Sequence, residues 1–221
     1  MKVTILLPTM NEEKTVGKTL ESIPKRKGLL YEKIIVDTNS TDNTIKIAMK
    51  YGCKIINESR KGYGRAYKTG LQKSTGEIIV CADADNTYPM EEIPRIITMM
   101  QNEGLDFITC SRFPDMDKGA MAKINYVGNI GLTFICNLLF NTKFKDTQGG
   151  MWFIRKKILP YMKLNEDDME FSTEIKLEAA KMGNMKEIPI TFRKREGEAK
   201  QKISNGFKIL KFMLKRRFLS S

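Results

Sequence analysis

Short apolar runs alternate with helical patterns along the first half of the chain, and this alternation constrains the fold more than any other feature. We expect strands at residues 3–7, 33–36, 53–56, 77–82 and 106–110. Helical patterns follow at residues 11–22, with Asn11 as N-cap, and at 43–51, 64–72 and 90–102. Strand, helix, strand at this spacing predicts parallel strands joined by right-handed crossovers. The expected fold class is therefore α/β, with a central, mostly parallel sheet and helices on both faces.

The second half is less regular. We expect a hairpin or strand turn at residues 145–155, helices at 124–140 and 171–181, and a strand at 187–192. Pro189 lies inside that strand and has no N–H to donate, so the strand belongs at a sheet edge. Residues 1–202 are expected to form one domain, followed at 203–221 by a basic amphipathic helix. Its pattern fits an interfacial position on anionic lipid and a core-packed position equally well.

The net charge of the chain indicates the kind of partner that it binds. Lys and Arg exceed Asp and Glu by 38 to 26, a net charge of +12, which predicts an anionic partner. The chain contains no histidine, so neither a Ser-His or Cys-His nucleophile nor a His-containing zinc site is possible. No run approaches the roughly 20 apolar residues of a membrane-spanning helix, and the first apolar run, residues 3–7, is too short for a signal peptide. We therefore expect a cytoplasmic protein that is peripheral to the membrane.

Polar and charged residues follow the predicted strands where each one ends. Asp37, the segment 60–65, the segment 83–87 and Arg112 all occupy such positions. Ligands of open α/β sheets bind in the crevice at the carboxyl ends of the strands. We expect these residues to face one crevice.

The sharpest local feature is Asp83-Ala84-Asp85, directly after an apolar strand. Carboxylates this close repel each other, and a divalent cation removes the repulsion. Hard oxygen ligands suit Mg²⁺ or Mn²⁺, and Mg²⁺ typically takes one or two carboxylates and completes its shell with phosphate and water. The alternative is a solvated turn, because Asp and Asn also favour turns.

A series of motifs surrounds this pair in a fixed order. Pro8-Thr9-Met10-Asn11-Glu12 follows the first strand, residues 37–44 follow the second, and Arg60-Lys61-Gly62-Tyr63-Gly64-Arg65-Ala66 follows the third. With Asp83-Ala84-Asp85, the order resembles that of family 2 glycosyltransferases of the Rossmann-like GT-A fold, in particular dolichyl-phosphate mannose and glucose synthases. The resemblance runs from about Val3 to about Lys202. It implies transfer of a sugar from a nucleotide diphosphate to a lipid phosphate.

The resemblance also implies residue roles on the donor side. The first motif holds the nucleotide, and Asp37 accepts hydrogen bonds from the base or ribose. The third motif lies beside the diphosphate, and the paired carboxylates bind Mg²⁺ or Mn²⁺. The residues carried over are Pro8, Asn11, Glu12, Asp37, Lys61, Gly64, Arg65, Asp83 and Asp85.

Further roles are implied on the acceptor side. Arg112, in the Ser111-Arg112 pair, and Lys123 match positions near the acceptor phosphate. Asp146-Thr147-Gln148-Gly149-Gly150 resembles the acidic motif near the reaction centre, with Gln148 closer to the glucose-type enzymes. Arg195 and Lys200 resemble the loop that closes over the diphosphate, although Ala199 replaces the usual Ser.

A lipid phosphate also explains why no base is needed. The second pKa of a phosphate monoester is near 6, so the acceptor is already an oxyanion nucleophile at pH 7. We expect an in-line displacement with inversion, in which Asp85, Arg112, Asp146 and Gln148 contribute to catalysis. The expected partners are a nucleotide-sugar donor, dolichyl or polyprenyl phosphate and an anionic membrane surface, without nucleic acid. The donor is open between a UDP-hexose, a UDP-N-acetylhexosamine and GDP-mannose.

Three other functions compete. A nucleotidyltransferase would usually carry a Gly-rich basic signature after the first strand, where this chain is acidic. A nucleic-acid-binding module would show aromatic residues among its basic ones, and here the Lys and Arg are dispersed. A family 2 transferase with a saccharide acceptor is the serious rival, with Asp146 or Glu174 as its base.

Overall fold

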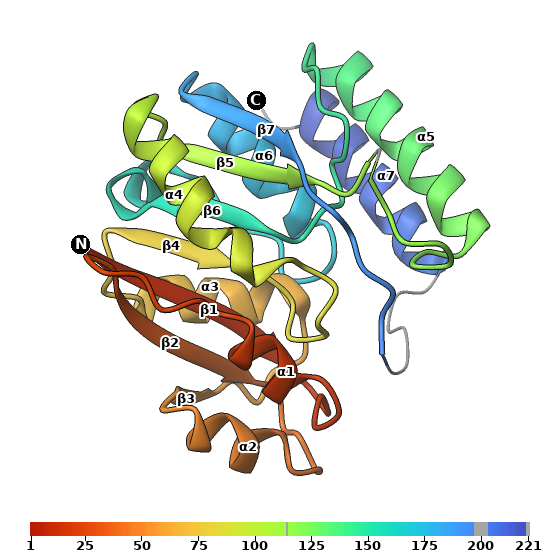
Figure 1. Ribbon diagram of the computed structural model, residues 1–221. Coiled ribbons are helices and arrows are strands. Elements are labelled where there is room, and N and C mark those ends of the chain that lie inside the picture. The colour runs from red at the N-terminus through yellow and green to blue at the C-terminus, as the bar shows by residue number, and fades with distance from the viewer. Residues whose placement is uncertain (114, 197–202, 220–221) are drawn as a thin grey trace.

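The computed structural model describes residues 1–113, 115–196 and 203–219, in which one sheet has the strand order β3-β2-β1-β4-β6-β5-β7 (Figure 1). Its strands are β1 (Lys2–Thr9), β2 (Leu30–Asp37), β3 (Lys54–Asn57), β4 (Ile78–Cys81), β5 (Phe107–Ser111), β6 (Trp152–Arg155) and β7 (Met185–Pro189). Strand β6 runs antiparallel to β4 and β5, and every other pairing is parallel. The prediction of a mostly parallel sheet is confirmed.

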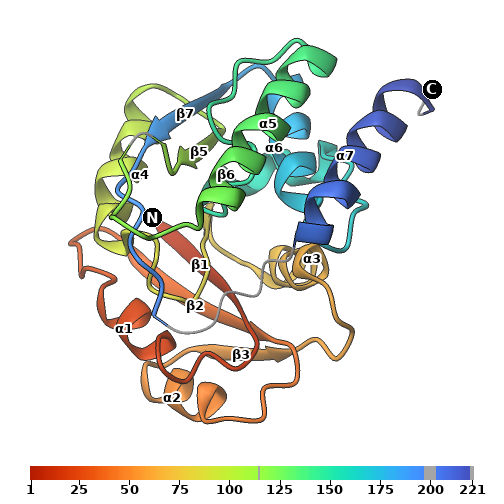
Figure 2. The same cartoon turned by 90° about the vertical axis from the view of Figure 1, so that its right-hand side faces the viewer.

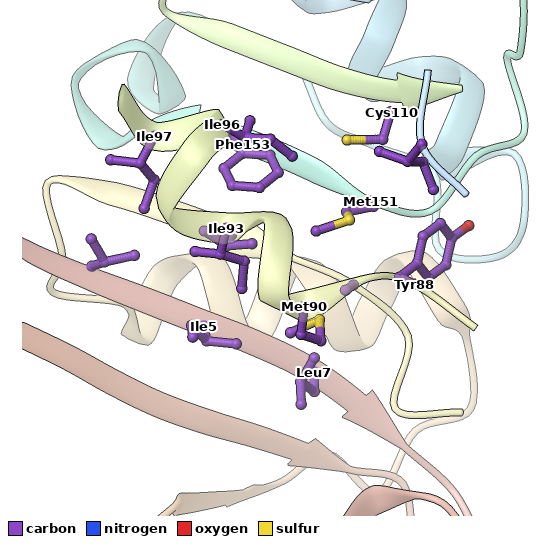
Figure 3. Packing of buried hydrophobic residues seen from close by; sticks show 14 of the residues in the cluster. Ile5, Leu7, Tyr88, Met90, Ile93, Ile96, Ile97, Cys110, Met151 and Phe153 are labelled. Atoms are coloured by element: carbon purple, nitrogen blue, oxygen red, sulfur yellow. The ribbon is translucent and has the colours of Figure 1, made fainter. Parts of the chain in front are cut away.

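Helices cover both faces of the sheet (Figures 1 and 2). The α-helices are α1 (Val16–Glu21), α2 (Thr44–Lys50), α3 (Tyr63–Lys73), α4 (Ile93–Asn102), α5 (Lys123–Phe140), α6 (Phe171–Lys181) and α7 (Ile203–Phe218), and the 3-10 helices are η1 (Met90–Glu92) and η2 (Lys156–Tyr161). Alternate residues of each strand serve opposite faces. Ile5 and Leu7 of β1 pack with helices α1 and α4, and Leu6 between them packs with α3 and α6. Figure 3 shows Ile93 and Ile96 of α4 directed towards the sheet beside Phe153.

The helix predicted at 11–22 is present as α1, but it spans only Val16–Glu21, and the prediction of Asn11 as its N-cap is wrong. Asn11 instead adopts a left-handed conformation with φ 56°, which Asn tolerates better than most residues. Its backbone N–H donates to Ser40 Oγ and its Oδ1 accepts from the Thr41 N–H. These bonds join the loop after β1 to the loop after β2, so Asn11 organises the end of the sheet.

The other predicted helices and strands are present in the structure, some of them with different bounds. Helix α6 has the predicted bounds, 171–181. Strand β7 lies at the edge of the sheet, as Pro189 predicts, although it spans Met185–Pro189 and not 187–192. The segment 145–155 contributes β6, which enters between β4 and β5.

Helices α5 and α7 lie side by side at one end of the molecule (Figures 1 and 2). Ile209, Phe212 and Met213 of α7 are buried with Cys136 of α5 and Leu177 of α6. The C-terminal helix is thus packed along one face, while other apolar side chains on it stay exposed. In the described part of the chain, no helix is long and apolar enough to cross a membrane.

Candidate active site

A cavity of about 460 Å³ opens where β1, β4 and β5 end. Of the predicted site residues, those on its wall are Pro8, Glu12, Lys61, Asp83, Asp85, Arg112, Gln148 and Arg195. They come from segments distributed along almost the whole chain. The expectation that strand-end residues would share one crevice is met for this group.

Asp83 and Asp85 are each held by one carboxylate oxygen. Oδ1 of Asp83 accepts from Tyr63 Oη at 3.2 Å and from Tyr67 Oη at 3.3 Å. Oδ1 of Asp85 accepts from the Thr87 hydroxyl at 2.6 Å and from the Thr87 N–H. Burial, together with the negative charge of Asp85, raises the pKa of Asp83 to about 7. The negative charges of the two carboxylates therefore disfavour each other, and positive charge nearby would stabilise their ionised forms.

Arg195 supplies positive charge at this point. Its Nη1 donates to Asp85 Oδ2 at 2.7 Å and its Nη2 donates to Glu12 Oε1 at 2.9 Å. The guanidinium joins residues 110 and 183 positions away in the sequence. Its Nε is buried and has no hydrogen-bond partner among the described residues. The arginine thus lies between two carboxylates without satisfying all of its own donors.

The same wall has the chemistry of a divalent cation site. The available donors are carboxylate oxygens, and a cationic group already lies between Asp85 and Glu12. A Cβ at Gly150 would lie 2.7 Å from Tyr63 Oη and 3.1 Å from Asp83 Oδ2, so the glycine keeps space open beside both atoms. The described residues contain no cluster of three or more Asp, Glu, His or Cys able to hold a metal. A cation held here would need oxygens from a ligand in addition to Asp83 and Asp85.

Asp37 lies behind the cavity wall. It is 1% exposed, and its carboxylate accepts from Thr9 Oγ1 at 2.7 Å and from the Ser40 N–H and hydroxyl. Thr9 and Thr38 line the cavity in its place. Asp37 therefore ties together the loops after β1 and β2, and Asn11, which is also off the wall, does the same.

The residues of the basic loop before α3 have two different roles. Lys61 is on the cavity wall, whereas Gly64 and Arg65 are not. The Arg65 guanidinium pairs with Asp167, and a Cβ at Gly64 would lie 2.6 Å from the Glu166 carbonyl oxygen. The glycine is required for close packing against the segment before α6, where the sequence suggested close approach to a ligand.

Arg112 and Asp146 form a buried ion pair. Arg112 Nε donates to Asp146 Oδ2 at 2.7 Å and Nη2 donates to Oδ1 at 2.9 Å. Burial alone would raise the pKa of Asp146, but the charge and hydrogen bonds of Arg112 lower it to about 2. Asp146 also accepts from the Gln148 N–H, and Gln148 Nε2 donates to Thr173 Oγ1 at 2.7 Å. Asp146 is behind the wall and fixes Arg112 and Gln148, which are on it.

Two more charges lie beneath this pair. Lys176, 0% exposed on α6, donates to the Asp146 carbonyl oxygen at 2.6 Å. Glu187 accepts from the N–H groups of Lys145 and Asp146. Burial lowers the pKa of Lys176 to about 8, despite Asp146 and Glu187 nearby. We name Arg112, Asp146, Lys176 and Glu187 the buried charge network.

The positions of the remaining predicted residues differ. Lys123 is the first residue of α5 and is exposed, and it is not on the cavity wall. Lys200 lies outside the described residues.

Several residues of the wall were not predicted from the sequence. Tyr63 and Tyr88 contribute phenol groups, Asp168 a carboxylate and Asn205 an amide. Burial, followed for Tyr63 by the charge of Asp83, raises the pKa of Tyr63 and Tyr88 well above the ordinary range, so both stay protonated. Tyr63 and Tyr67, four residues apart on one helix, were the available signal for the first of these. Asp168 and Asn205 carried no local signal, since they reach the cavity only through packing of α6 and α7.

Sequence comparison identifies the family and relatives of this chain. The profile of the family described as Glycosyl transferase family 2 matches residues 4–161. A protein of Haloferax volcanii named dolichyl-phosphate hexose transferase is 32% identical over 89% of this chain and 85% of its own length. Dolichol-phosphate mannosyltransferase of Pyrococcus furiosus is 30% identical over 96% of the chain, which spans 62% of that protein. The chain spans only 53% of a third relative, low-salt glycan biosynthesis hexosyltransferase Agl6 of Haloferax volcanii, at 32% identity.

Solved structures give the same fold. Glucosyl-3-phosphoglycerate synthase from Mycobacterium tuberculosis, in complex with Mn²⁺, UDP and glucosyl-3-phosphoglycerate, superposes with a TM-score of 0.77 at 18% identity. The superposition covers 98% of this chain and 80% of that one. The family profile and the relatives, together with this GT-A-like architecture, show that the chain belongs to glycosyltransferase family 2.

Proposed function

We propose that this glycosyltransferase moves a hexose or N-acetylhexosamine from a UDP-sugar or GDP-mannose to dolichyl or polyprenyl phosphate, with inversion. The product would feed glycan assembly such as protein N-glycosylation. The observation that carries the proposal is the composition of the cavity. Its wall combines the carboxylates of Glu12, Asp83 and Asp85 with the Arg112 guanidinium, which lies 5.5 Å from the Phe192 ring, and with the apolar side chains of Met121 and Met169.

These two sets of side chains suit two different ligands. The carboxylates match a nucleotide diphosphate that would arrive with Mg²⁺ or Mn²⁺ held by Asp83 and Asp85, and such a cation would neutralise charge on the leaving diphosphate. Arg112 and the apolar side chains offer a cation to a phosphate and apolar surface to a lipid chain. The names of the dolichyl-phosphate hexose and dolichol-phosphate mannose transferases support this assignment.

The remaining roles in the reaction fall to further basic residues. Arg195 and Lys61, with Lys200, offset charge on the diphosphate oxygens. Arg112 is held by Asp146 through Nε and Nη2, and its Nη1 is the group proposed to bind the acceptor phosphate. An acceptor phosphate oxygen then forms the new bond to the anomeric carbon on one side, while the bond to the diphosphate breaks on the other and its electron pair leaves with the diphosphate.

The structure leaves the earlier candidate bases poorly suited to deprotonating a sugar hydroxyl. Asp146 is fully buried with its pKa near 2. Glu174, 1% exposed, accepts from the N–H groups of Asn165 and Glu166 and is not on the cavity wall. A phosphate acceptor does not require such a base. This contrast favours a lipid phosphate over a saccharide.

One carboxylate does favour the saccharide alternative. Asp168 lies on the wall, and its Oδ2 pairs with Lys208 Nζ at 2.8 Å. If the acceptor were a sugar hydroxyl, Asp168 would be the base, and Asp168→Asn would abolish transfer. With a phosphate acceptor, the same variant keeps turnover within a few-fold of wild type.

The proposed function is tested by incubating the purified protein with labelled UDP-glucose, UDP-N-acetylglucosamine or GDP-mannose and dolichyl phosphate. A labelled lipid product from one donor, lost when a chelator removes Mn²⁺, is the expected result. Metal-dependent donor binding or hydrolysis without any lipid product would contradict the acceptor and leave the family assignment intact.

We also infer contact with a membrane surface through helices α5 and α7. The α5–α7 apolar face comprises exposed side chains of both helices: Ile124, Val127, Phe134 and Leu138 of α5, and Phe207, Leu214 and Phe218 of α7. The exposed Lys208, Lys211 and Lys215 lie on the same helix as part of this face. Asn125 and Asn205, near the starts of the two helices, line the cavity. Apolar surface flanked by Lys and next to the cavity mouth fits an anionic bilayer that presents the acceptor.

Vesicle binding tests this inference. Co-sedimentation with vesicles that contain phosphatidylglycerol should fall about tenfold or more in the Phe134→Ser/Leu138→Ser variant, because two exposed apolar side chains are lost. Met49→Ser, an exposed apolar residue of α2, is the matched control and should bind like wild type. Unchanged vesicle binding, or a wild-type dimer that dissociates in the variant, would show that a membrane is not what covers this face.

A further inference from the structure

The tyrosines of α3 make a contact that the proposed reaction does not itself use. Tyr63 and Tyr67 lie four residues apart, so both project from the same side of the helix. Both hydroxyls donate to one atom, Asp83 Oδ1. Two neutral donors therefore converge on one oxygen of a carboxylate that would otherwise turn freely at the end of β4.

Tyr67 is fixed more firmly than an ordinary hydrogen-bonding side chain. It is 0% exposed, and its ring packs against Trp152 at 4.9 Å and against Phe171 at 5.9 Å between centroids. Tyr63 contacts it edge-on at 4.9 Å. With the ring held on several sides, the Tyr67 hydroxyl has a defined position, and so does the oxygen to which it donates.

Helix α3 is itself held close to the sheet. A Cβ at Gly70 would lie 2.2 Å from Leu6 Cδ1, so this approach is open only to glycine. The position of the tyrosine hydroxyls is therefore set by packing of the helix on β1 and not by the cavity ligands.

The other oxygen of Asp83 is left for the cavity. Oδ2 receives no hydrogen bond from the residues described, and it lies beside the space that Gly150 keeps open. Asp85 shows the same division, with Oδ1 held by Thr87 and Oδ2 paired with the Arg195 cation. Each carboxylate is thus anchored by one oxygen and offers the other to positive charge.

We propose that Tyr63 and Tyr67 are positioning residues that hold Asp83 by Oδ1 so that Oδ2 is presented to the divalent cation of the nucleotide diphosphate. The inference rests on the proposed function, because it assigns the tyrosines to that same metal site. Hydrogen bonds to a ligating group orient it, and their removal typically weakens metal binding about 10- to 100-fold. Tyr67, as the buried and rigidly packed partner, is expected to contribute more than Tyr63.

The test measures Mn²⁺ binding by electron paramagnetic resonance titration of the full chain, alone and with saturating UDP or GDP. Tyr67→Phe keeps the ring and removes the hydroxyl, and we expect about tenfold weaker Mn²⁺ binding with a further loss in Tyr63→Phe/Tyr67→Phe. Tyr31→Phe is the matched control, because the Tyr31 hydroxyl is buried without a hydrogen-bond partner among the described residues. It should bind Mn²⁺ within twofold of wild type.

Two readouts separate positioning from a general structural role. Saturating Mn²⁺ should restore most of the turnover of Tyr67→Phe, whereas a distorted fold would not respond to added metal. If Tyr67→Phe does not fold, Tyr63→Phe alone provides the same comparison from the half-buried partner. Wild-type Mn²⁺ affinity in both phenylalanine variants would overturn the positioning role alone. A wild-type protein that binds no Mn²⁺ with either nucleotide would overturn the proposed metal site as well.

Discussion

The two sides of the cavity handle charge in opposite ways. On the side built by β1 and β4, Glu12, Asp83 and Asp85 reach the cavity wall, and Arg195 is the cation between two of them. On the side built by β5 and β6, Asp146 lies behind the wall and is already neutralised by Arg112. The first side keeps negative charge at the surface of the cavity, and the second keeps its charges paired in the interior.

The carboxylates on the first side are placed to bind a ligand, whereas the ion pair on the second side stabilises the fold. Asp85 is only 4% exposed, but its partner Arg195 also pairs with Glu12, so replacing Asp85 leaves that arginine a second carboxylate. A buried pair is different, because removing one partner leaves the other charge unpaired away from water. Substituting Asp by Asn on each side should therefore produce different kinds of defect.

The largest effect is expected from Asp85→Asn. Loss of the charge that would bind the divalent cation should lower turnover about a thousandfold. Loss of the bond to Arg195 should lower the free energy of unfolding by about 1.5 to 3 kcal/mol. Initial rates at saturating donor and urea unfolding measure the two quantities. Turnover within about tenfold of wild type would contradict the metal role of Asp85.

Asp146→Asn should show the reverse balance. The substitution leaves the buried Arg112 and Lys176 without their common carboxylate, at a cost of about 3 to 5 kcal/mol in the free energy of unfolding. Urea unfolding of this variant, compared directly with Asp85→Asn, measures the difference. Equal stability of the two variants would contradict the proposed difference between the two sides of the cavity.

Arg195→Gln sharpens the comparison on the carboxylate side. With the guanidinium gone, Asp85 Oδ2 loses the cation with which it pairs, so Mn²⁺ alone should bind about three- to tenfold more tightly. With UDP or GDP present the preference should reverse, because Arg195 is proposed to offset charge on the diphosphate. Calorimetric titrations with and without nucleotide check both signs, and weaker binding of Mn²⁺ alone would refute the competition between the two cations.

A separate effect, on stability and not on metal binding, concerns pH and the buried charge network. Lys176 has a pKa of about 8 in the folded protein, below the value of about 10.4 in an unfolded chain. Between these values the unfolded chain holds the proton and the folded protein does not. The free energy of unfolding should therefore rise with pH across this window, by up to about 1.4 kcal/mol per pH unit from this group.

Urea unfolding at pH 8 and pH 10 measures that rise as a difference between wild type and Lys176→Met. Lys73→Met, at the exposed end of α3, serves as the control and should leave the slope unchanged. The groups that face Lys176 are Asp146, Glu187, Arg112 and Cys110. An identical pH dependence in wild type and Lys176→Met would show that Lys176 keeps its proton throughout.

The fold was predictable because its signals are local. Apolar runs at residues 3–7 and 77–82, with helical patterns between them, are enough to indicate parallel strands. The carboxyl ends of such strands meet at one edge, which is why Pro8, Asp83 and Arg112 were expected together and lie on one cavity wall. Helix α1 was the exception, since Asn11 bonds to the loop after β2, and that contact has no local signature.

The charges were harder to assign. Arg65 looked like a ligand for phosphate and is paired with Asp167, and Asp146 looked like an active-site carboxylate and is buried behind Arg112. In the C-terminal helix, the sequence could not decide between core packing and exposure. Ile209 and Met213 are buried, while Phe207 and Phe218 are exposed, so each alternative holds for part of the helix.

The sequence by itself determined the order of the elements and the family, because both depend on residue types at short and regular spacing. Only the tertiary structure decided which charged and polar groups contact one another. Arg195 reaches Asp85 across 110 residues, Tyr67 reaches Asp83 through the packing of α3, and Lys176 is buried under the Asp146 loop. Ion pairs and hydrogen bonds depend on separations of about 3 Å, and those are set by how the helices pack on the sheet.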